Sequence, residues 1–163
     1  MPKAGLQFQK KDQWNTPKDV VDTFGLFDYD PATTDEQAEY LDILDYDTIQ
    51  TDGLESDWTE YKKIWVNPPF TKKGAFLLKA VQSLEWMDDD ARIFFLIPIE
   101  FTTTKLFHNI MGGQGYIMYI PNGRIKFDDG SGRSSSPAFG SVVLEMGPKY
   151  TKKEVKHWKL YGR

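Results

Sequence analysis

The chain has 163 residues, enough for one compact domain that buries roughly 70% of the surface of its unfolded state. A hydrophobic content of 40%, with 15% aromatic residues, supports a packed core and excludes general disorder. The absence of cysteine excludes a disulfide scaffold and thiolate metal sites, and indicates a reducing, cytoplasmic setting. The N-terminal segment 1–12 is polar and no apolar run reaches about 18 residues, so we expect neither a secretory signal nor a membrane span.

The net charge of −4 is unevenly distributed along the chain. Residues 1–60 contain 4 basic and 15 acidic side chains, whereas residues 61–163 contain 16 basic and 9 acidic ones. Because neutralisation of phosphates supplies much of the affinity for nucleic acids, the second half can present a basic face to a polyanion. Two solvated surfaces without a partner explain the same distribution equally well.

The first third of the chain predicts short helices and strands in alternation. A helix is expected over 17–24, because a proline in the first turn loses no hydrogen bond. A short strand over 27–30 and a helix over 35–44 follow, and 48–50 is a possible second strand.

The remainder continues the alternation. A strand over 63–66 is stopped by two prolines, a helix over 73–86 has apolar residues at helical spacing, and 92–98 is a continuous apolar run typical of a strand buried on both faces. A helix over 103–111 and strands over 116–120, 124–127 and 139–145 complete the pattern. This alternation favours a single α/β domain over 1–163, with a mainly parallel central sheet flanked by helices.

Two segments fall outside this pattern. The stretch 128–137 is rich in Gly and Ser and too polar to pack, so we expect a mobile loop. The tail 148–163 has 6 basic residues against Glu154 alone, which suits either contact with phosphates or a surface strand. The sequence shows no metal-ligand cluster and no Ser/His/Asp arrangement.

The most specific signal for chemistry is Asn67-Pro68-Pro69-Phe70, directly after a hydrophobic strand. Proline cannot donate to a sheet ladder, so the pair ends the strand and makes the turn stiff. The Asn67 side-chain oxygen and the Pro68 carbonyl are two acceptors suited to an exocyclic amino group, and Phe70 offers a face on which a planar base can stack. A proline loop with a hydrophobic plug is an equally plausible interpretation of these four residues alone.

The four residues and their neighbours resemble the amino-group methyltransferases, and in particular the small phage-type DNA adenine-N6 methyltransferases. The resemblance extends over about residues 13–146. It rests on the order of these segments: Trp14 to Pro17, Asp30 to Thr33, Asp52 to Leu54 with Trp58, Trp65 to Phe70, Leu96 to Pro98 with Thr102 to Thr104, and Gly123 to Phe127.

This resemblance implies a Rossmann-like class I methyltransferase fold and S-adenosyl-L-methionine as the cofactor. The catalytic residues would be Asn67, Pro68, Pro69 and Phe70. The cofactor would be held by Trp14, Thr16, Pro17, Asp30, Pro31, Ala32 and Asp52. From the residues themselves, Thr16-Pro17 also reads as an ordinary helix cap and Asp52 as a turn residue before Gly53. The loop from Asp30 to Thr33 departs from the glycine-rich loop usual in methyltransferases.

The implied substrate is adenine in double-stranded DNA, flipped out of the helix to reach the catalytic loop. Arg124, Lys126 and Arg133 are the candidate nucleic-acid contacts, because arginine binds phosphate or guanine edges; a solvated hairpin is the alternative. A phage origin would place the protein in the cytoplasm of a bacterial host. Other possible functions are methylation of RNA or of protein glutamine, or a catalytically inactive nucleic-acid-binding module on the same fold. Neither the target sequence nor the oligomeric state follows from the sequence.

Overall fold

The structure is a computed structural model that describes residues 12, 14–128, 134–135 and 139–160. Its helices are α2 (Lys18–Asp22), α3 (Asp35–Tyr40), α4 (Lys73–Leu84) and α5 (Lys105–Met111), with short 3-10 helices η1 (Gly53–Glu55), η2 (Phe70–Lys72) and η3 (Ile99–Thr103). Its strands are β1 (Lys63–Val66), β2 (Arg92–Pro98), β3 (Tyr116–Pro121), β4 (Phe127–Asp128), β5 (Ser134–Ser135), β6 (Ser141–Met146) and β7 (Lys153–Trp158). None of the described helices is long and apolar enough to cross a membrane.

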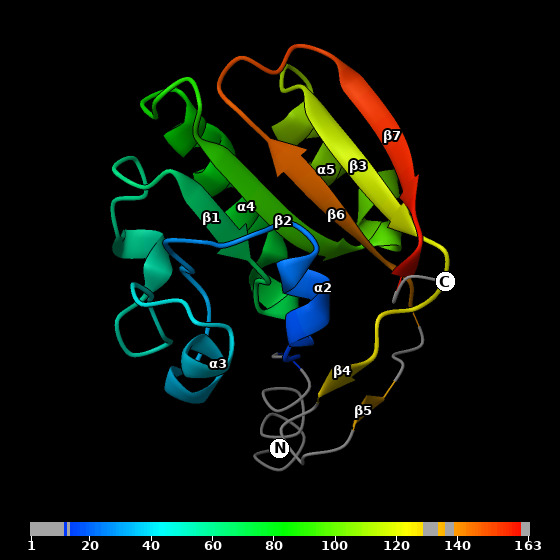
Figure 1. Cartoon of the computed structure of the whole chain (residues 1–163). Helices are drawn as coiled ribbons and strands as arrows, with labels where there is room; N and C mark the ends of the chain where they lie inside the picture. Colours follow the sequence, from blue (N-terminus) through cyan, green and yellow to red (C-terminus); the bar gives the residue numbers. More distant parts are fainter. Residues whose placement is uncertain (1–11, 13, 129–133, 136–138, 161–163) are drawn as a thin grey trace, which may run out of the picture.

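The central sheet has the strand order β1-β2-β6-β3-β7 (Figure 1). β1 pairs with β2, and β3 with β7, in parallel, whereas β6 is antiparallel to both of its neighbours. Four of the five strands therefore share one direction, and the predicted α/β fold with a mainly parallel sheet is confirmed. The carboxyl ends of β1 and β2, where ligands bind in such sheets, lie side by side.

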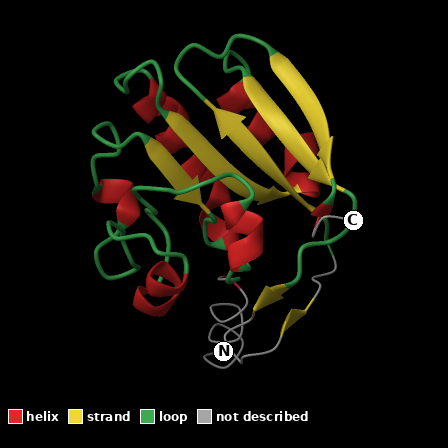
Figure 2. Ribbon diagram, in the orientation of Figure 1, coloured by secondary structure: helices red, strands yellow, loops and turns green. Residues whose placement is uncertain are grey.

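Helices cover both faces of the sheet: α2 lies in front of it, and α4 and α5 lie behind it (Figures 1 and 2). β2 shows why, because its side chains alternate between two buried clusters. Ile93, Phe95 and Ile97 pack in the cluster that contains residues of α4 and α5, and Phe94 and Leu96 pack in the cluster that contains residues of α2. The prediction of a strand buried on both faces is confirmed.

The first strands are shorter than predicted. The predicted strand 27–30 is reduced to single bridges, from Tyr29 to Ile64 and from Asp30 to Tyr46, which extend the sheet beyond β1. The possible strand 48–50 is wrong, because this segment is a turn. The Thr51 hydroxyl accepts from the Thr48 N–H at 2.8 Å, and the Asp52 N–H donates to the Thr48 carbonyl at 2.8 Å. Local hydroxyl groups thus satisfy the backbone in place of a ladder.

The segment after β3 also differs from the prediction. Of the expected strand 124–127 only Phe127 is in a strand, β4, which pairs with β5. Asn15 forms a bridge with Asp128, so the N-terminal segment lies beside β4. The predicted mobile loop 128–137 therefore contains paired backbone at Asp128 and at 134–135, while 129–133 and 136–138 lie outside the described residues.

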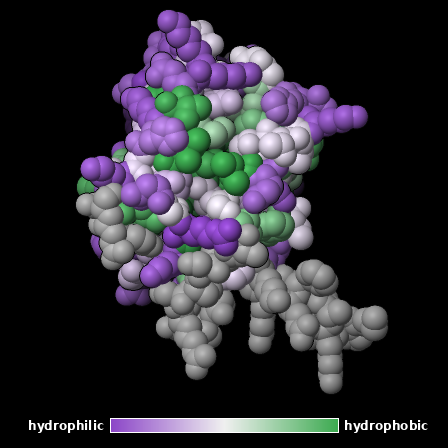
Figure 3. All heavy atoms as spheres, turned by 90° about the vertical axis from the view of Figure 1, so that its right-hand side faces the viewer, coloured by the Kyte–Doolittle hydropathy of each residue, from purple (hydrophilic) through white to green (hydrophobic). Residues whose placement is uncertain are grey.

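The basic tail forms the edge strand β7, so the alternative of a surface strand is the one observed. All its residues except Trp158 are exposed, including Val155. Figure 3 views the molecule from this side and shows hydrophobic residues bordered by hydrophilic ones. Lysine on an edge strand discourages pairing with another sheet.

Candidate functional site

The Asn67 loop begins where β1 ends, because Pro68 and Pro69 cannot continue the ladder. The Asn67 amide group donates to the Trp14 carbonyl, and also to the Thr16 hydroxyl at 3.0 Å. A carbonyl only accepts hydrogen bonds, so the amide nitrogen must face Trp14. The N-terminal segment therefore fixes the orientation of the Asn67 side chain.

This orientation leaves two acceptors unused on the loop. Among the described residues, no group donates to Asn67 Oδ1 or to the Pro68 carbonyl. Asn67 is only partly buried, and Pro68, although buried, lines a pocket together with Asn67, so a ligand in that pocket can donate hydrogen bonds to this part of the loop. An amino group with two hydrogens has the complementary chemistry.

Three hollows meet at this loop. The Asp30 pocket includes Thr16, Asp30, Thr33 and Asn67 in its lining; the Phe70 pocket includes Asn67, Pro68, Phe70, Lys73 and Phe139; the Asp52 pocket includes Ala32, Thr33, Asp52, Gly53 and Pro69. Asn67 lines the first two, and Thr33 and Ala32 line both the first and the third. A ligand spanning the Asp30 and Asp52 pockets would thus end beside a second ligand in the Phe70 pocket.

The Phe70 pocket has aromatic walls. Phe70 is 39% exposed, and its ring centroid lies 5.6 Å from that of Phe139 at an interplanar angle of 48°. Trp14 and Phe127 also line this pocket, and their rings meet edge to face at 6.2 Å. Such walls suit a flat, apolar-faced ligand.

The Asp30 carboxyl group is buried, with 2% of its surface exposed. It accepts a hydrogen bond from the Ala32 N–H at 2.9 Å. Burial raises the pKa of Asp30 to about 7, and the Ala32 hydrogen bond opposes this rise. A buried carboxylate without a cation is costly, so a positively charged ligand would find its partner here.

This burial predicts a gain of stability when the charge is removed. Between about pH 4 and pH 7 the folded protein retains a proton on Asp30 that the unfolded chain has lost, so stability falls as pH rises across this window. The Asp30→Asn variant keeps an acceptor for the Ala32 N–H. We expect its Tm to exceed that of the wild type at pH 8 and to match it near pH 4. Thermal unfolding across this range checks the prediction, and equal Tm values at pH 8 would contradict it.

Asp52 lines its pocket and also shapes it. Its backbone has φ 56°, and its side chain accepts from the Leu54 N–H at 3.1 Å, so it caps η1. A Cβ atom on Gly53 would lie 1.9 Å from the Pro31 carbonyl oxygen, so only glycine fits between this turn and the loop after Asp30. The cofactor-binding and turn interpretations of Asp52 are therefore compatible.

Of two further predicted cofactor residues, Thr16 lines the Asp30 pocket, and Pro17 lines a neighbouring hollow that Thr16 also lines. Thr16 is buried, and its hydroxyl accepts from Asn67. Pro17 caps α2, but this helix has five residues and its first N–H, that of Lys18, donates to the Tyr40 hydroxyl. Thr33 ends the loop from Asp30 to Thr33, which the resemblance assigns to the cofactor. It is buried, and among the described residues no group bonds its hydroxyl.

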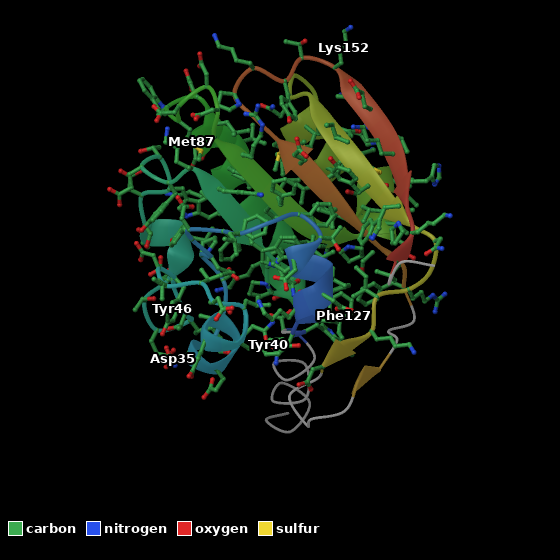
Figure 4. The ribbon with its side chains drawn as sticks, viewed as in Figure 1. Asp35, Tyr40, Tyr46, Met87, Phe127 and Lys152 are labelled. Carbon is green, nitrogen blue, oxygen red and sulfur yellow. The ribbon has the colours of Figure 1, made fainter. Side chains whose placement is uncertain are left out.

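The structure describes two of the three predicted nucleic-acid contacts, Arg124 and Lys126. Arg124 and Lys126 are exposed and flank buried Ile125, so alternation places both on the solvent side. Lys126 lines a hollow with Thr16, Pro17 and Tyr40. Figure 4 shows Phe127 and Tyr40 at this end of the molecule, below the sheet. Arg133 lies outside the described residues.

Among the residues of the Phe70 pocket that the sequence analysis did not assign to the site are Asp12, Lys73 and Phe139. Phe139 was assigned to a strand that in fact begins at Ser141. One feature of the sequence could have indicated a special role for Lys73: it lies in the first turn of the predicted helix, where a cation opposes the helix dipole.

The sheet has adjoining pockets at the carboxyl ends of its strands. The protein is therefore an α/β protein that can hold two ligands next to each other. Residues 3–155 match the family model described as DNA N-6-adenine-methyltransferase (Dam), and the chain belongs to this family. It is 28% identical over 141 residues to a protein of Escherichia phage T1 named DNA N-6-adenine-methyltransferase. The match covers 84% of this chain and 56% of that relative, so the chain spans little more than half of its length.

Solved structures show weaker similarity. A protein of Listeria monocytogenes, described as a class I S-adenosylmethionine-dependent methyltransferase, has a TM-score of 0.44 at 13% identity, covering 85% of this chain and 52% of that one. A protein of Pyrococcus horikoshii, described as an RNA methyltransferase, has a TM-score of 0.45 at 13% identity, covering 80% of this chain and 66% of that one.

Proposed function

We propose that the protein transfers a methyl group from S-adenosyl-L-methionine to the N6 amino group of adenine in DNA. The observation that carries this proposal is the Asn67 loop. Its two acceptors, to which no group of the described residues donates, lie at the Phe70 pocket, and Asn67 also lines the Asp30 pocket. Membership of the Dam family supports adenine as the target base and DNA as the molecule that is methylated.

The residues of the Asp30 and Asp52 pockets fit this cofactor. The buried Asp30 carboxyl group suits a ligand that carries positive charge. The Thr33 hydroxyl, which has no hydrogen-bond partner in the described part of the chain, suits a polar ligand. Asp52 supplies an acceptor on the other side of Thr33. Together with Trp14, Thr16, Pro17, Pro31 and Ala32 these residues would hold the cofactor, which supplies a methyl group on a cationic sulfur.

The Asn67 loop would act on the amino group of the target base. Asn67 Oδ1 and the Pro68 carbonyl each accept one amino hydrogen, which favours a tetrahedral nitrogen as positive charge develops on it. This interaction strengthens in the transition state, where binding energy raises the rate. Because Trp14 and Thr16 already hold the Asn67 amide, little reorganisation is needed.

The base would reach this loop by leaving the DNA helix. An adenine amino group in a duplex is enclosed in the base stack, so double-stranded DNA must be opened at a cost of a few kcal/mol. Stacking on Phe70 contributes about 1–3 kcal/mol toward that cost. Phe139 faces the same pocket and would limit the thickness of the base that enters.

We expect Arg124 to contact the DNA backbone. The Arg124→Ala variant should bind DNA more weakly, and the slope of log affinity against log salt concentration should fall by about 1. Binding measured by fluorescence anisotropy at several salt concentrations tests this, with Lys152→Met as a control at the opposite end of the molecule (Figure 4). An unchanged slope would assign Arg124 to an ordinary solvated surface.

Transfer of a tritiated methyl group to DNA, RNA and protein acceptors tests the function as a whole. Incorporation into the N6 position of adenine in DNA is the expected result. Labelling of RNA or of protein glutamine would show that the substrate is not DNA, although the reaction is still methyl transfer to an amino group. Absence of transfer to every acceptor, with DNA binding retained, would favour the inactive binding module.

A further inference from the structure

Lys73 joins the Phe70 pocket to a neighbouring apolar groove. It is the first residue of α4, and both hollows include Phe70, Lys73, Pro98 and Phe139 in their linings. The Lys73 ammonium donates to the Phe70 carbonyl at 2.9 Å and lies 4.1 Å from the centroid of the Phe70 ring. The same side chain therefore holds both the backbone and the ring of Phe70.

The surroundings of Lys73 destabilise its positive charge. A positive charge at a helix N-terminus opposes the helix dipole. Partial burial lowers the pKa of Lys73, against the opposing effect of Asp12. Both oxygens of Asp12 are bonded by Thr71, and among the described residues no ion pair includes Lys73. The ammonium thus lies closest to the Phe70 ring, with the Phe101 ring centroid at 5.3 Å, and among the described residues no carboxylate forms an ion pair with it.

We propose that Lys73 is a positioning residue, whose ammonium holds Phe70 in the orientation in which the flipped adenine stacks. This inference rests on the proposed function of Phe70. A cation–π contact and a charged hydrogen bond to one residue restrict both its ring and its carbonyl. Lys73 therefore acts on the base through Phe70.

A double-mutant cycle tests the coupling. The wild type, Lys73→Met, Phe70→Ala and the double variant are compared by kcat and KM for DNA free of N6-methyladenine, at saturating cofactor. Lys73→Met should lower kcat about tenfold, with cofactor affinity and Tm unchanged. It should add little loss in the Phe70→Ala background. Lys73→Arg should restore most of kcat, and Lys152→Met is the matched control for the loss of one lysine.

Three results would overturn the proposal. The first is additive losses in the cycle. The second is a raised KM with a weaker salt dependence and unchanged kcat, which would make Lys73 a phosphate contact. The third needs no catalysis: crystal structures of Lys73→Met and Lys73→Arg should show Phe70 displaced only in the methionine variant, and an unmoved ring refutes the inference. A wild type without DNA methylation would count against the proposed function, and the crystal structures would still decide the role of Lys73.

Discussion

The Asn67→Ala variant is expected to lose methyl transfer, with kcat reduced at least about a hundredfold, while cofactor affinity stays within a few-fold of the wild type. The alanine removes the acceptor that strengthens as charge develops on the target nitrogen. It also removes the two hydrogen bonds to Trp14 and Thr16, which lie at the edge of the Asp30 pocket. Initial rates with tritiated cofactor, and calorimetric titration of the cofactor, measure the two effects separately.

The Thr16→Val variant serves as the control for this experiment. It removes one of the two partners of the Asn67 amide and leaves the Asn67 oxygen in place. Its kcat should fall less than that of Asn67→Ala. If both variants lose activity equally, or if Asn67→Ala loses cofactor binding outright, the loop is a scaffold for the cofactor and the assignment of Asn67 to the amino group is wrong.

The Gly53→Ala variant should lose about 3 kcal/mol of stability, a decrease in Tm of about 10 °C, and bind the cofactor more weakly. A Cβ atom at this position meets the backbone of Pro31 at 1.9 Å, and a backbone cannot turn aside as a side chain can. The Asp52 turn and the loop after Asp30 must separate, which distorts the Asp52 pocket that Pro31 and Gly53 both line. Thermal unfolding and cofactor titration measure both effects.

Gly113→Ala is the matched control, because a Cβ atom there has no neighbour within 4 Å. This variant should unfold within about 1 kcal/mol of the wild type. Equal stability of the two variants would show that the Pro31 loop moves freely, which contradicts the close packing described for the Asp52 pocket.

Those parts of the site that depend on local chemistry could be predicted from the sequence. Two prolines end a strand wherever they stand, so the position of Asn67 at the end of β1 followed directly. The continuous apolar run of β2 predicted burial on both faces, and the two clusters confirm it. The predicted helices were present, although α3 ended early, where Asp42 adopts a positive φ.

The other features of the site and fold could not be predicted, because they depend on contacts between distant segments or on side chains that compete with strand pairing for the backbone. Nothing in the sequence near Trp14 indicates that its carbonyl meets Asn67, 53 residues away. The contact between Phe70 and Phe139 is equally remote. The residues 48–50 have the composition of a strand, but threonine hydroxyls close a turn there and the pairing passes to Tyr46.

The surroundings of Asn67 come from segments far apart in the chain, which has a consequence for folding during biosynthesis. Asn15 is paired with Asp128, and Phe139 closes the pocket against Phe70, so the loop acquires its full surroundings only when the chain through these residues has left the ribosome. A nascent chain that already carries β1 and Asn67 still lacks a wall for the base. We therefore expect a chain that ends before Phe139 to lack a complete Phe70 pocket.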